Sequence, residues 1–167
     1  MSSKHDATLT TGPFLVPQFT QSLCVGPAAS TNDLLVITLK NPTNKPLSAS
    51  LAITRCPIPS PFIFTGFPII FNTAESPLFT VPPTTVPAMS CTRFEFPIAA
   101  NQRETLRVET SGDYAVDDCL PICDKLEISV LGGHAEPGTP PGLNNPDATL
   151  FFRYEDFVVC EKKHDDD

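Results

Sequence analysis

NDLLVITLKNPTNKPLSASLAITR, residues 32–55, carries the clearest pattern in the chain and decides the fold class. Apolar and polar residues alternate on both sides of a central turn sequence, NPTNKP, at residues 41–46. Alternation with a period of two puts one face of a β-strand in a core and the other in solvent. We therefore expect a β-hairpin here. Its apolar positions are Leu35, Ile37 and Leu39 before the turn, and Leu47, Ala49, Leu51 and Ile53 after it.

The same alternation recurs towards the end of the chain. In SCTRFEFPI (90–98) it sets Thr92, Phe94 and Phe96 against Arg93 and Glu95. It is repeated in RETLRVETSGDY (103–114) and KLEISVLGG (125–133), and a last strand is expected in ATLFFRYEDFVV (148–159). The pattern and the turn sequences between its segments are typical of a two-sheet arrangement. The chain is therefore predicted to be all-β: a single β-sandwich or jelly roll of about eight or nine strands.

The segment between residues 57 and 87 is rich in both phenylalanine and proline. Its two apolar stretches, PFIFTGFPIIF (61–71) and PLFTVPP (77–83), are interrupted by prolines. Because proline lacks the N–H that a sheet ladder needs, it is confined to edge strands, strand ends and bulges. We expect these stretches to form short or edge strands.

Composition supports one domain and argues against several partners. A chain of 167 residues that is 41% apolar can bury one core, and its 19 prolines are incompatible with long helices. A net charge of −8 disfavours nucleic acid as a partner, since phosphate binding needs a positive surface. No apolar run approaches the length of a membrane span, and residues 1–20 lack the apolar core of a signal peptide. We expect no membrane insertion and no classical signal peptide.

Residues 1–21 differ in character from the rest of the chain. They are polar and threonine-rich, with Gly12, Pro13 and Pro17 as breaks, and they predict an extended N-terminal arm or connector. A domain at 22–160 and a disordered acidic tail at 161–167 follow. The arm contains a short apolar segment, called the apolar island below, whose side chains would be exposed to solvent unless another surface buried them. That surface is either a neighbouring subunit or the arm's own domain, on which the arm would pack as a first strand. The candidate inter-subunit contacts are Phe14, Leu15, Val16 and Phe19.

Six cysteines are more than a cytosolic domain of this size usually carries, and they favour disulfides within or between chains. Only one pair is close, as C-x3-C, and no histidine stands at ligand spacing, so neither a zinc site nor a thioredoxin-like C-x-x-C centre is expected. We predict no metal and no cofactor. The pairing stays open, because six cysteines allow fifteen complete pairings. The candidate cross-linking residues are Cys24, Cys56, Cys91, Cys119, Cys123 and Cys160.

Catalytic patterns are not found in the sequence. There is no G-x-S-x-G elbow for a nucleophile. The neighbouring carboxylates at residues 117–118 and 155–156 are expected to point apart, as adjacent side chains do in a strand. We therefore expect a protein that is not an enzyme.

Three stretches, read in order, are similar to a known family. They are QSLCVGPAASTNDLLVITLKNPTNKPLSASLAI (21–53), RFEFPIAANQRETLRVETSGDYAV (93–116) with LEISVLGG (126–133), and ATLFFRY (148–154). In these the chain resembles the subunits of bacterial endospore appendages, jelly-roll proteins that stack into fibres on the spores of Bacillus-type bacteria. The resemblance implies a self-assembling structural protein whose N-terminal connector docks into preceding subunits and is tied there by disulfides, with Cys24 at a matching position.

Together these features predict an extracellular fibre subunit at the spore surface. Its partners would be copies of itself, joined head to tail by insertion of the arm, and a spore-surface anchor protein. Two alternatives remain. One is an extracellular β-sandwich that binds a receptor or glycan, and the other is a virion or capsid jelly roll.

Overall fold

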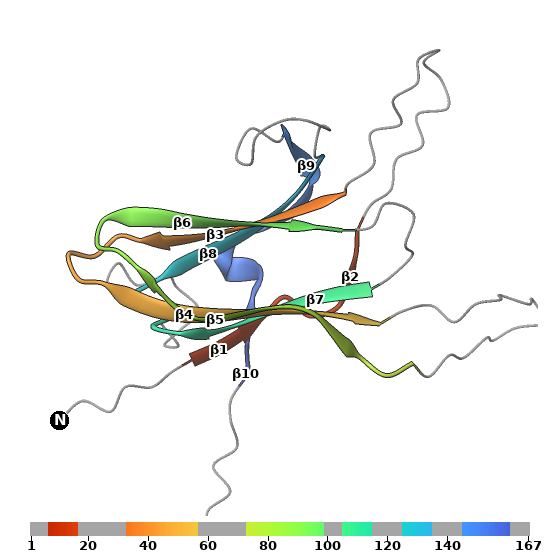
Figure 1. Ribbon diagram of the computed structural model, residues 1–167, viewed down its shortest axis with the longest axis horizontal. Helices are drawn as coiled ribbons and strands as arrows, with labels where there is room; N and C mark the ends of the chain where they lie inside the picture. Colours follow the sequence, from red (N-terminus) through yellow and green to blue (C-terminus); the bar gives the residue numbers. More distant parts are fainter. Residues whose placement is uncertain are drawn as a thin grey trace, which may run out of the picture.

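The computed structural model describes residues 7–16, 33–56, 73–98, 105–114, 125–134 and 145–160. Within these ranges two antiparallel sheets pack face to face, and the predicted all-β sandwich is confirmed, with ten strands instead of eight or nine (Figure 1). One sheet has the order β10-β1-β7-β4-β5, with β2 also paired to β7, and the other has the order β6-β3-β8-β9. The strands are β1 (Ala7–Thr10), β2 (Phe14–Leu15), β3 (Leu34–Asn41), β4 (Leu47–Cys56), β5 (Ser76–Val86), β6 (Ser90–Pro97), β7 (Thr105–Gly112), β8 (Glu127–His134), β9 (Asn145–Phe152) and β10 (Val158–Cys160).

Strands β3 to β8 are wound as three pairs, each of which passes from one sheet to the other. The pair β3–β4 is flanked by β5–β6 on one side and by β7–β8 on the other, so that β4 lies between β5 and β7 while β3 lies between β6 and β8. This is the winding of an antiparallel hairpin rolled into two layers, as in a jelly roll. No helix in the described ranges is long and apolar enough to cross a membrane.

The hairpin predicted at residues 32–55 is wrong, because β3 and β4 lie in different sheets and are joined by an arch. Alternation is the same in a hairpin and in an arch, since in both one face of each strand enters the core. The arch is closed by Asn41, which is 1% exposed. Its Nδ2 donates to the carbonyls of Lys45 (2.8 Å) and Val86 (3.0 Å), and its Oδ1 accepts from the N–H of Thr43 (3.0 Å). The bond to Val86 ties this arch to the one between β5 and β6.

The last predicted strand, residues 148–159, is also divided. Strand β9 ends at Phe152, a helical turn η1 (Tyr154–Asp156) follows, and β10 pairs in the opposite sheet. The backbone N–H of Arg153 donates to Asp156 Oδ2 at 2.7 Å, which caps the turn. The side chain of Phe157 enters the core between the sheets and is 9% exposed. The chain passes from one sheet to the other at this buried ring.

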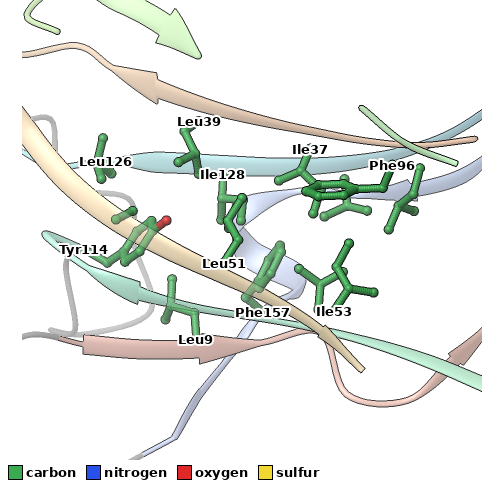
Figure 2. Packing of buried hydrophobic residues seen from close by; sticks show 14 of the residues in the cluster. Leu9, Ile37, Leu39, Leu51, Ile53, Phe96, Tyr114, Leu126, Ile128 and Phe157 are labelled. Atoms are coloured by element: carbon green, nitrogen blue, oxygen red, sulfur yellow. The ribbon is translucent and has the colours of Figure 1, made fainter. Parts of the chain in front are cut away.

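The core lies between the two sheets, and the predicted alternation is confirmed there. Figure 2 shows Leu9, Leu51 and Ile53 of the larger sheet facing Ile37, Leu39, Phe96 and Ile128 of the smaller one. Tyr114 follows β7 and is 1% exposed, with its hydroxyl 2.7 Å from the Thr110 hydroxyl. Burial raises the pKa of Tyr114, so this phenol stays neutral and belongs to the core.

Strand β5 confirms the prediction for PLFTVPP as an edge strand, although with 11 residues it is not short. It pairs with β4 on one side only and contains Pro77, Pro82 and Pro83. Register shifts interrupt its pairing at two places. The stretch PFIFTGFPIIF and the tail 161–167 lie outside the described residues.

Candidate functional site

Residues 7–16, which lie within the arm predicted for residues 1–21, form strands of their own domain. Strand β1 lies between β7 and β10, and β2 continues along the same side of β7 (Figure 1). Ala7 and Leu9 enter the core with 6% and 2% exposure. Of the two interpretations of the apolar island, packing on the same chain is therefore the one observed. The domain extends at least to Ala7, and residues 17–21 lie outside the described part.

A short break at Gly12 separates β1 from β2. The φ of Gly12 is +68°, which residues with a side chain adopt only at a cost. Across the break, the N–H of Thr11 donates to the carbonyl of Val108 at 3.0 Å, and the Thr11 hydroxyl accepts the N–H of Val108 at 3.1 Å. The strand therefore follows β7 along most of its length in spite of the glycine and Pro13.

The predicted contact residues of the island have different surroundings. The Phe14 ring lies 4.8 Å from the ring of Phe152 in the opposite sheet, and Val16 packs against the core. Leu15 points away from the core and is 61% exposed. Phe19 lies outside the described residues. Of the described island residues, Phe14 and Val16 thus pack on the sandwich and Leu15 is accessible.

Two of the six candidate cysteines have described side chains, and both are free thiols. Cys91 is exposed on β6, and Cys56 is half-buried at the end of β4. Cys160 ends β10, opposite Thr8 of β1. Cys24, Cys119 and Cys123 lie outside the described residues. Among the described side chains there is no disulfide.

Cys56 and Cys91 lie at opposite ends of the sandwich. Cys91 pairs with Lys40, one residue before the arch, whereas Cys56 lies at the far end of β4. At about 3.3 Å per residue, the length of this strand separates them by roughly 30 Å. A disulfide requires Cα atoms within about 7 Å. The two thiols therefore cannot be joined within one folded chain.

This separation predicts the outcome of disulfide mapping. After mild oxidation of the folded protein, peptides containing Cys56 joined to Cys91 should be found in species of dimer mass or larger and should be missing from the monomer band. Mass spectrometry of non-reduced digests from each gel band measures this. A Cys56–Cys91 link in the monomer would contradict the arrangement of β4 and β6.

Two of the ion pairs between described residues lie on the smaller sheet, and a third, Arg107–Glu75, lies on the larger one. Lys40 Nζ lies 3.0 Å from Glu127 Oε2, and this hydrogen bond and charge raise the pKa of Lys40. On β6, Arg93 Nη2 lies 2.9 Å from Glu95 Oε1. Both signs of charge are present among the described residues on the outer face of the smaller sheet, so these residues form neither an anionic nor a cationic patch.

No geometry for catalysis or metal binding is seen in the part of the chain that the structure describes. There, no group of three or more His, Cys, Asp or Glu side chains is close enough to hold a metal ion. The neighbouring carboxylates of Glu155 and Asp156 do point apart: the first pairs with the Arg153 guanidinium at 3.5 Å, and the second caps η1. The features that remain in the described residues are strand edges, exposed apolar side chains such as Leu15 and Val158, and accessible thiols.

Two structurally important residues were missed in the sequence. Asn41 lies in the turn sequence NPTNKP and Gly112 in the alternating segment 103–114, and the pattern singles out neither. An asparagine directly before proline, at the end of an alternating strand, was the available signal for the first. Nothing local marks the second, because its role depends on the approach of β4.

No family model, no curated protein and no solved structure matches this chain.

Proposed function

We propose that the protein is a self-assembling structural subunit of an extracellular fibre, in which the strand formed by residues 7–15 completes the sheet of a neighbouring copy. Copies would be joined head to tail, with disulfides as covalent reinforcement. The resemblance to endospore appendage subunits adds the spore surface as the place of assembly and an anchor protein there as a further partner.

The observation that carries the proposal is how the N-terminal strand is attached. Strand β2 ends opposite Thr105, and β3 begins opposite Pro97, so both ends of the connection lie at the same end of the sandwich. Packed sheets are about 10 Å apart, whereas residues 17–32 can span roughly 50 Å. The connection is thus several times longer than its own chain needs. Such excess length lets the strand dock in a second copy with unchanged pairing, as in domain swapping.

The strand also occupies a place that the sheet cannot leave empty. It is the neighbour of β10 in the larger sheet, so its removal would separate β10 from β7. It would also uncover one side of β7 and the core around Leu9. An exposed strand edge with apolar surface beside it favours the addition of a strand from another chain. When copies exchange this strand, each copy therefore regains the contacts that the strand makes in the monomer.

Removal of residues 1–16 tests the proposal. We expect this variant to form no fibres and to melt roughly 10 °C below the full-length protein, because it loses the burial of Leu9 and one strand of the ladder. A synthetic peptide of residues 7–16 should restore most of the melting temperature. The same peptide in excess should shorten the fibres of the full-length protein. Electron microscopy with and without reductant, together with thermal melting, measures these effects.

A peptide with Leu9→Asp is the matched control, since it keeps the backbone and loses the core contact; it should neither rescue nor inhibit. Fibres of unchanged length from the truncated variant would refute the proposal. Full-length protein that stays monodisperse at every concentration would favour the binding module, and closed particles would favour a shell protein.

A further inference from the structure

The free side of β6 is the edge of the sandwich that is best suited to pair with another strand. Of the four edge strands in the described sheets, β5 contains three prolines, β10 has three residues, and β9 begins with Asn145–Pro146 and has an irregular register with β8. Strand β6 pairs in unbroken register with β3 from Ser90 to Pro97, and its single proline is the last residue. It is thus a long, regular edge strand. Natural proteins usually block such edges with prolines, bulges or charges, because an open edge pairs with strands of other chains.

The backbone of β6 presents its hydrogen-bonding groups at known positions. The N–H of Ile98 donates to the carbonyl of Asp33 at 2.7 Å, one step beyond the Leu34–Pro97 pair. Because hydrogen-bonded pairs alternate along an antiparallel ladder, Phe96, Phe94 and Thr92 direct their backbone groups towards β3. The alternate residues Cys91, Arg93 and Glu95 direct theirs outward, away from the sheet.

The side chains of β6 divide in the same way between two faces. Phe96 is buried in the core, and the Phe94 ring stacks 6.3 Å from it and is half-buried. Arg93 and Glu95 lie on the outer face, with side chains 39% and 16% exposed, and pair with each other at 2.9 Å. The edge therefore combines an incompletely buried aromatic ring with one charge of each sign.

We infer that β6 pairs with β6 of a second copy, antiparallel about a two-fold axis at Phe94. In this register Arg93 lies opposite the partner's Glu95, and Glu95 opposite the partner's Arg93. The backbone groups of Arg93 and Glu95 point outward, so each residue would form backbone hydrogen bonds with the same partner residue to which its side chain is paired by charge. Phe94 faces its own copy at the axis, where the side chains of a non-hydrogen-bonded pair are closest.

Other two-fold registers that use the same outward backbone groups are less stable. A shift of one residue per chain towards the N-terminus puts Arg93 opposite Arg93, and the opposite shift puts Glu95 opposite Glu95. Like charges directly across a ladder are destabilising. A further shift reduces the overlap of the two strands and places neither Arg93 nor Glu95 opposite a charged residue of the second copy. The sequence of β6 thus selects one register.

The junction joins only the smaller sheets of the two copies. Together they would form one continuous sheet with the order β9-β8-β3-β6 followed by its two-fold mate. On the same side of the sandwich, the prolines of β5 prevent the larger sheet from continuing in the same way. This contact does not involve the N-terminal strand and does not rest on the proposed function. Its symmetry is isologous and closes at two copies, unlike a head-to-tail contact.

Mixing two charge variants of the full-length protein tests the inference. Arg93→Glu alone gives Glu–Glu contacts across the axis, and Glu95→Arg alone gives Arg–Arg contacts. We expect each variant to dimerise at least about tenfold more weakly than wild type. In an equimolar mixture every contact becomes Glu–Arg, so a heterodimer with near wild-type affinity should appear. Sedimentation velocity with one variant fluorescently labelled measures it, in reductant and with excess of the peptide of residues 7–16 to suppress strand exchange.

Arg153 and Glu155 supply the matched control. They are also a pair two residues apart with opposite charges, but they follow β9 at the other edge of the sheet. Arg153→Glu and Glu155→Arg should leave dimerisation unchanged, alone and mixed. Circular dichroism checks that all four variants are folded.

The mixture separates a contact between chains from a role within one chain. Each single variant also disrupts the internal Arg93–Glu95 pair, and mixing cannot repair that, so rescue by mixing requires pairing across copies. Folded variants that show no heterodimer, or wild-type protein that stays monomeric up to millimolar concentration, would overturn the inference. Loss of fibres in the truncated variant with the β6 dimer retained would show that the two contacts are independent.

Discussion

Replacing Gly112 with alanine should unfold the protein or lower its free energy of unfolding by about 3 kcal/mol or more. A Cβ atom at this position would lie 2.2 Å from the carbonyl oxygen of Ser48 and 2.8 Å from Cα of Ala49. Both are backbone atoms of β4, so no rotation of a side chain can relieve the clash. The φ of Gly112 is +156°, which residues with side chains rarely adopt. Strands β4 and β7 would have to separate at this point.

The location of Gly112 explains why the effect is large. It pairs with Ala7 of β1 on one side and with Ala49 of β4 on the other. The adjoining chain is held by two hydrogen bonds: the N–H of Asp113 donates to the Ser48 carbonyl at 3.0 Å, and the N–H of Ser48 donates to Asp113 Oδ2 at 2.8 Å. A shift of β4 away from position 112 would strain both.

Gly12→Ala is the matched control. Gly12 also has a positive φ, +68°, but no atom lies within 4 Å of where its Cβ would be. Only backbone strain is introduced there, so a cost of about 1–2 kcal/mol is expected. Urea unfolding followed by circular dichroism compares the two variants. Equal stability of both would show that β4 and β7 are not as close as described.

Replacing Asn41 with aspartate should cost about 3–5 kcal/mol at neutral pH. The two hydrogens of Asn41 Nδ2 bind the carbonyls of Lys45 and Val86. A carboxylate has no hydrogen to offer, so a buried negative charge would face two carbonyl oxygens. The arch between β3 and β4 would lose its bond to the arch between β5 and β6.

The same substitution should introduce a pH dependence. Burial and the loss of donors raise the folded-state pKa of the new carboxyl above its unfolded value, so the folded state binds the proton more tightly. The destabilisation is therefore full at neutral pH and is partly relieved as the pH falls towards the unfolded pKa, near 4. Asn44→Asp, at an exposed position of the same arch, should change the stability by less than about 0.5 kcal/mol. Urea midpoints at pH 7 and pH 4.5 measure both; equal midpoints for the two variants at pH 7 would contradict the burial of Asn41.

The strand edges and thiols could be predicted from sequence only in part. The apolar island was found to need cover, and Phe14 and Val16 are covered, but by their own chain. The prolines of PLFTVPP identified an edge strand, since the missing N–H is a local property. The open edge of β6 was not identified, because which strands lie at the edge of a sheet depends on long-range pairing. The cysteine positions were known, but the distance between Cys56 and Cys91 follows from the path of β4.

The amino-acid sequence by itself determined that this protein is all-β and which face of most strands enters the core. Alternation and proline placement act within a few residues, and Leu35, Ile37, Leu106, Val108 and Ile128 are buried as the pattern requires. Only the tertiary structure decided which strands pair. It made an arch of the expected hairpin, divided the last strand between two sheets, and placed residues 7–15 against β7. The physical reason is that one buried face satisfies the same pattern whether the neighbouring strand is next in sequence or a hundred residues away. The choice depends on buried polar groups such as Asn41 and on close approaches such as that at Gly112.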